Sequence, residues 1–90
     1  MLTLEQAREF LRIDGTDNDT LIQSMLDAIP SYIETTTGMA TVAQDAEPLV
    51  NTAARFIIQL WYNAEQAESE KLQRTIDGLL KVISVKARTV

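Results

Sequence analysis

The chain has 90 residues, of which 46% are hydrophobic and 23% charged, a composition typical of a globular domain and not of a disordered one. A chain this short supports one hydrophobic core, so we expect a single domain over residues 1–90. The formal net charge of -5 argues against sequence-specific nucleic-acid binding, and the absence of cysteine excludes disulfides and thiolate metal sites, as in a reducing compartment.

No apolar run approaches the ~20 residues that a membrane span requires. The first residues contain neither a basic region nor a long apolar one, so we expect no signal peptide. These features predict a protein that works in a cytoplasm, without a membrane partner.

The first predicted helix begins after Thr3 and ends near residue 11 or 12. The Thr3 side chain can accept a hydrogen bond from the Gln6 backbone while the Gln6 side chain reaches back, which is a capping box. Apolar residues at positions 4, 7, 10 and 11 share one side of this helix. The turn that follows contains Asp14 and Gly15, and we expect the glycine to supply a positive φ there.

The second predicted helix is capped by Asp17 or Asp19 and ends at Gly38 as C-cap. Its expected buried stripe consists of Ile22, Met25, Leu26, Ile29 and Ile33. Pro30 lies inside this stripe and removes one backbone hydrogen bond, so we expect a kink or a break near it. If the proline kinks a continuous helix, the isoleucines on both sides of it pack into the same core.

Residues 39–44 are predicted to be a connection, in which a short strand is an alternative. The third helix opens at Asp45 or Ala46 and tolerates Pro48 in its first turn. Its apolar face is the strongest in the chain and contains Val50, Ala53, Ala54, Ile57, Ile58 and Trp61. Trp61 and Tyr62 are favoured as core and boundary residues over the alternative of stacking on a base or lining a pocket.

Residues 65–71 are polar and fit either a helix continuation or a loop. A fourth helical stripe follows, made of Leu72, Ile76, Leu79, Leu80 and Ile83. Gly78 weakens this helix, and residues 84–90 are expected to form a mobile tail. The fold class is therefore predicted to be all-α, a small bundle of about four helices with a kinked second helix.

Charge is unevenly distributed along the chain, because Asp77 is the only acidic residue after residue 70. Five of the eight basic residues lie in that last part, namely Lys71, Arg74, Lys81, Lys86 and Arg88. One interpretation is a solvated face with a frayed tail. The other is a head-to-tail contact between the basic end of one subunit and the acidic body of the next, with Arg74, Lys81, Lys86 and Arg88 as candidate interface residues.

The sequence offers little catalytic chemistry, because it lacks histidine and cysteine and with them the usual triads and zinc ligand sets. The acidic turn Asp14, Asp17, Asn18 and Asp19 does not follow the calcium-loop spacing, so a turn with a helix cap is the favoured interpretation. No glycine-rich phosphate loop occurs. Glutamates 65, 68 and 70 are not paired as acid and base. We predict no enzyme activity, no cofactor and no bound metal.

The order of features in the first 38 residues is the most informative pattern. These features are a leucine-rich first helix, the turn Leu11-Arg12-Ile13-Asp14-Gly15, and a longer helix that closes with Tyr32-Ile33-Glu34 and Thr37-Gly38. This pattern resembles the opening of the small phage head-tail connector proteins, and the resemblance extends over residues 3–83. The chain departs from the family pattern at Pro30, at Ala64, where family members often have arginine after a tyrosine and an asparagine, and at a final helix without a clear proline start.

The resemblance implies a structural head-tail connector of a phage or prophage, which forms a homo-oligomeric ring between portal and tail. By the same resemblance, the ring would contact the portal protein and tail-completion proteins, extend the DNA channel and let DNA pass through its lumen. An acidic lumen would let DNA slide, because like charges oppose sticking. The protein would assemble in the host cytoplasm and reside in the virion neck.

A different function class stays open from the residues alone: a small acidic helical regulatory or inhibitor module that binds a host protein. A host protein co-purifying at fixed stoichiometry would favour that class, whereas neighbouring genes for portal, protease and capsid would favour the connector.

Overall fold

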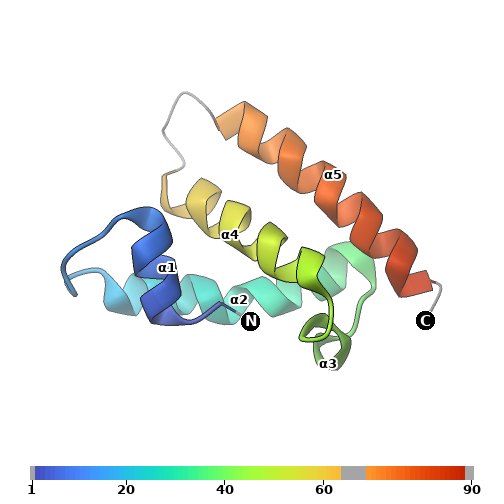
Figure 1. Ribbon diagram of the computed structural model, residues 1–90, viewed down its shortest axis with the longest axis horizontal. Helices are drawn as coiled ribbons and strands as arrows, with labels where there is room; N and C mark the ends of the chain where they lie inside the picture. Colours follow the sequence, from blue (N-terminus) through green and yellow to red (C-terminus); the bar gives the residue numbers. More distant parts are fainter. Residues whose placement is uncertain (1, 64–68, 89–90) are drawn as a thin grey trace.

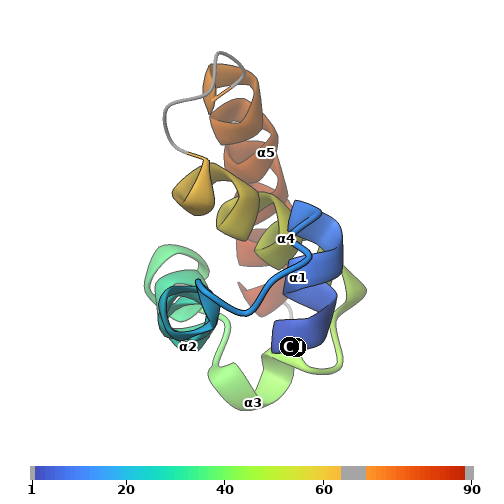
Figure 2. The same ribbon diagram turned by 90° about the vertical axis from the view of Figure 1, so that its left-hand side faces the viewer.

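The computed structural model describes residues 2–63 and 69–88. Five helices follow in chain order: α1 (Leu4–Leu11), α2 (Asp19–Thr37), α3 (Thr41–Gln44), α4 (Pro48–Tyr62) and α5 (Ser69–Arg88). Figure 1 shows α4 running between α2 and α5, and Figure 2 shows α1 beside α4. The described part of the chain contains no strand, and four of its five helices have eight residues or more, which confirms the prediction of a small all-α bundle of about four helices.

The core lies where α4 packs against α2, α5 and α1. Its largest fully buried side chains are mostly isoleucines, namely Ile22, Ile29 and Ile33 of α2, Ile57 and Ile58 of α4, and Ile76 and Ile83 of α5. Ala53 and Ala54 on α4 are completely buried, and such small side chains let neighbouring helices approach closely. The predicted stripes of the three long helices thus face one core, with Met25, Trp61 and Leu79 only half-buried at its edge. Leu72 is half-buried and is not part of this core.

The capping box of α1 is confirmed, since the Thr3 hydroxyl accepts from the Gln6 backbone at 3.1 Å and the Thr3 backbone donates to Gln6 Oε1 at 3.0 Å. The turn after α1 differs from the prediction. Arg12, and not Gly15, takes the left-handed conformation, with φ 59°. The reason is that Arg12 and Ile13 donate their backbone N–H groups to the last carbonyls of α1, which requires the left-handed residue directly at the helix end.

The predicted cap of α2 is wrong. Asn18 is the N-cap residue and makes no side-chain capping bond, while its side-chain Nδ2 donates to the Tyr62 hydroxyl at 2.7 Å. Asp19 is the first helical residue, and its carboxylate lies 3.6 Å from Nε of Arg8 on α1. These two contacts attach the start of α2 to α4 and α1.

Pro30 lies inside one continuous helix, as the kinked-helix prediction required. Ile29 and Ile33 on either side of it are both completely buried in the core. The helix ends at Gly38 as predicted, with the glycine at φ 83° and its N–H donated to the Glu34 carbonyl.

The connection between α2 and α4 contains the four-residue helix α3 and no strand. Its last residue, Gln44, is 2% exposed, and its Nε2 donates to the carbonyls of Pro30 at 2.9 Å and Met39 at 3.1 Å. This amide ties α3 to the middle of α2. Helix α4 then begins at Pro48 and not at Asp45 or Ala46, because proline's fixed φ and missing N–H suit the first helical position.

Helix α5 carries the predicted fourth stripe, with Ile76, Leu80 and Ile83 buried. It continues to Arg88, so residues 84–88 are helical; mobility of the segment 84–90 stays a prediction, and residues 89–90 lie outside the described part. The predictions for Ala64, Glu65 and Glu68 also fall outside the described residues.

None of the helices that the structure describes is long and apolar enough to cross a membrane.

Gly78 offers a direct test of α5. It is exposed inside the helix, and a Cβ built on it meets no atom within 4 Å. We expect Gly78→Ala to raise the free energy of unfolding by about 0.5–1 kcal/mol, because alanine loses less backbone entropy in a helix. Urea unfolding of the two proteins measures the difference. An unchanged or lowered stability would contradict a helix that is continuous through residue 78.

Candidate functional site

The solvent side of α5 combines cationic and apolar side chains. We call it the α5 face and define it by the exposed residues Arg74, Gly78, Lys81, Val82, Val85 and Arg88. Val82 and Val85 are 46% and 55% exposed, although residues of this type are usually buried. The buried residues of α5 lie on the opposite side of the helix, against α4 and α2. The α5 face therefore has no packing partner within the described chain.

Three of the four predicted interface residues belong to this face. Arg74, Lys81 and Arg88 are exposed and form no ion pair within residues 2–63 and 69–88. Lys86 is different, because its Nζ lies 2.7 Å from Oε1 of Glu47, the N-cap residue of α4. The Glu47 side chain is only 12% exposed, so this pair joins the end of α5 to the start of α4 within one subunit.

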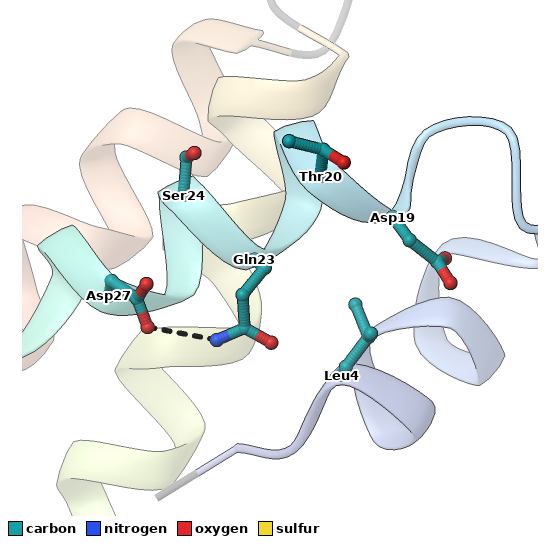
Figure 3. A pocket seen from close by; sticks show the side chains of 6 residues that line it. All are labelled: Leu4, Asp19, Thr20, Gln23, Ser24 and Asp27. Atoms are coloured by element: carbon teal, nitrogen blue, oxygen red, sulfur yellow. Dashed lines mark hydrogen bonds between the residues drawn. The ribbon is translucent and has the colours of Figure 1, made fainter.

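A recess opens between the N-terminal part of α1 and the first half of α2 (Figure 3). Its volume is about 370 Å³, and its lining consists of Leu4, Asp19, Thr20, Gln23, Ser24 and Asp27. Leu4 supplies an apolar wall from α1. We call this hollow the α1–α2 recess.

The two carboxylates of the α1–α2 recess have different partners. Within the described residues, Asp19 is paired with the Arg8 guanidinium, whereas Asp27 accepts only a neutral hydrogen bond, from Gln23 Nε2 at 2.8 Å. Figure 3 shows this bond along the α2 side of the recess. An incoming cation would therefore find no positive charge already paired with Asp27, whereas Asp19 is paired with Arg8.

A second, smaller hollow of about 180 Å³ lies where α2, α3 and α5 end, and it is lined by Gly38, Met39, Ala40, Ala43 and Ala87. Close to it in sequence, Val42 on α3 is 87% exposed. These residues bear no titratable group, so this hollow offers shape and apolar surface but no acid, base or ligand chemistry.

The acidic turn and the aromatic pair have structural contacts. Tyr32 and Trp61 meet edge to face with their ring centroids 5.5 Å apart, and Tyr62 accepts the Asn18 amide. These contacts agree with boundary positions for Trp61 and Tyr62. Among the residues that the structure describes, no group of three or more acidic side chains is placed to hold a metal ion.

Sequence reasoning missed two parts of this surface. Val82 and Val85 lie three residues apart and off the buried stripe, a signal that a helical projection of α5 contains. The α1–α2 recess gave no such signal, because it depends on how α1 docks beside α2.

A family described as phage gp6-like head-tail connector protein matches residues 1–88. Neither the curated proteins nor the solved structures gave a match. The match covers nearly the whole chain, including all five helices described above. The chain therefore belongs to the phage gp6-like head-tail connector proteins and is a structural component of the phage head-tail junction.

Proposed function

We propose that copies of this protein close into a ring on the portal protein of a phage or prophage and extend its DNA channel toward the tail-completion proteins. The observation that carries the proposal is the family match over residues 1–88. In this role the protein is architectural and not an enzyme, it assembles in the host cytoplasm, and it remains in the virion neck.

The size of one subunit supports a ring. Its extents of 41 × 27 × 18 Å leave no room to surround a DNA duplex, so a channel requires several copies. Identical subunits that meet through two different surfaces form a closed ring when the rotation between neighbours closes. We therefore expect a head-to-tail contact, and not a two-fold symmetric one.

The charge distribution supports the polarity of that contact. Arg74, Lys81 and Arg88 are exposed on α5, while the rest of the chain carries all the acidic residues but Asp77 and Glu70. A basic surface on one copy then meets an acidic surface on the next, which favours association in one orientation. Lys86 acts mainly within its own subunit, through Glu47.

The test is assembly on the portal. We expect the purified protein to be monomeric when dilute and to form rings at high concentration or on the cognate portal, seen by negative-stain microscopy and mass measurement. A portal from an unrelated phage is the control and should recruit no ring. A protein that stays monomeric, does not bind its portal and binds a host protein tightly would contradict the connector function and support the function of an inhibitor.

A further inference from the structure

We propose that the α5 face of one subunit docks in the α1–α2 recess of the next subunit, with Lys81 directed at Asp27 and Val82 and Val85 against Leu4. This inference rests on the proposed ring and specifies its two contacting surfaces. The occupant of the recess is thus a second copy of this chain.

The apolar part of the α5 face indicates a protein partner. Val82 and Val85 expose about half of their surface between Lys81 and Arg88. A surface that holds a phosphate backbone gains from cations alone, whereas exposed valines gain only when another apolar surface covers them. Leu4 supplies such a surface in the α1–α2 recess.

The charges of the two surfaces are complementary. Within residues 2–63 and 69–88, Lys81 has no ion pair and Asp27 has only the neutral amide of Gln23 as partner. A lysine can lay its aliphatic stem on an apolar wall while its ammonium reaches a carboxylate. The recess offers both groups, because Leu4 and Asp27 line the same hollow.

The positions of the two surfaces fit a head-to-tail contact. No residue of α5 lines the α1–α2 recess, so one subunit cannot fill its own recess with its own α5 face. Figure 1 shows α1 and the first turns of α2 at one end of the molecule and the C-terminal half of α5 at the other. Two separate, complementary surfaces are the requirement for a ring of identical subunits.

A charge swap tests the contact. We expect Asp27→Lys or Lys81→Glu alone to weaken ring formation on the portal by about tenfold, because attraction becomes repulsion at a partly exposed pair. We expect the double variant Asp27→Lys/Lys81→Glu to recover most of the loss, since the exchanged charges meet again across the contact. Concentration series read by mass measurement give the change, and circular dichroism checks that each variant folds. For the apolar half, Val85→Ser should also weaken the ring.

The matched control is Glu9→Lys/Arg55→Glu, which makes the same charge changes at exposed positions outside the two surfaces. It should leave ring formation unchanged. This contact would be overturned if both single variants formed rings as readily as the wild type, or if the double variant formed rings no better than the single ones. Either result would leave the connector function standing. A wild-type protein that forms no ring and binds no portal would instead reject the proposed function itself.

Discussion

Replacing Ile57 by alanine is expected to lower the free energy of unfolding by about 2–5 kcal/mol, the usual cost of deleting most of a buried aliphatic side chain. Ile57 is 1% exposed and lies in α4, the helix that contacts α1, α2 and α5. A domain of this size has a net stability of only several kcal/mol, so this substitution should leave much of the protein unfolded at room temperature.

Chemical denaturation followed by circular dichroism measures this loss. The control is Arg55→Ala on the exposed side of the same helix, which should change the free energy of unfolding by no more than about 0.5 kcal/mol. If Ile57→Ala costs as little as its control, the side chain does not contribute to the core and the facing of α4 is wrong.

Gln44→Glu should destabilise the protein by about 3 kcal/mol or more at neutral pH, the usual cost of an uncompensated buried charge. The amide of Gln44 donates to the carbonyls of Pro30 and Met39 in a site that is 2% exposed. A carboxylate has the same shape but only accepts hydrogen bonds, so it would face two carbonyl oxygens while buried and charged. The substitution thus exchanges two hydrogen bonds for two repulsive contacts.

The pH dependence separates the charge from the lost hydrogen bonds. Burial beside carbonyls raises the pKa of the introduced carboxyl above its unfolded value of about 4.3. The folded state then prefers the protonated form, so the deficit is full above the raised pKa and shrinks as the pH falls toward 4. Gln44→Met removes the same bonds without a charge, and its deficit should not vary with pH. Parallel pH profiles for the two variants would contradict this account.

The three long helices could be predicted from the sequence because their apolar residues repeat at helical spacing. Most of each predicted stripe lies in the core, from Ile22 to Ile33 on α2, from Val50 to Ile58 on α4 and from Ile76 to Ile83 on α5. The other predicted members, Met25, Trp61, Leu72 and Leu79, are only half-buried. The helix ends were harder, because tertiary contacts compete with local ones. Asn18 donates to Tyr62 instead of capping α2, and the short α3 has too few residues for a periodic pattern.

The candidate interface stays a prediction, and the structure shows only which of its charges are paired within one subunit, because charge can be read from a sequence but pairing cannot. Arg74, Lys81 and Arg88 remain available on α5, while Lys86 reaches Glu47, which lies 39 positions earlier in the chain. The α1–α2 recess was not predictable, since its wall and floor come from two helices whose relative placement no local pattern encodes.

If a neighbouring subunit docks in the α1–α2 recess as proposed, the way α1 is attached links folding to assembly. This helix has eight residues, only Ala7 among them is fully buried, and so short a helix is unstable on its own. Undocking α1 alone costs less free energy than unfolding the whole domain, so hydrogen exchange should be faster in α1 than in α4. Because Leu4 of α1 is one wall of the α1–α2 recess, each such local opening also dismantles the recess. In the proposed ring, a neighbour that binds only the intact recess would hold α1 in place, so protection of the α1 amides from exchange would be a direct measure of ring closure.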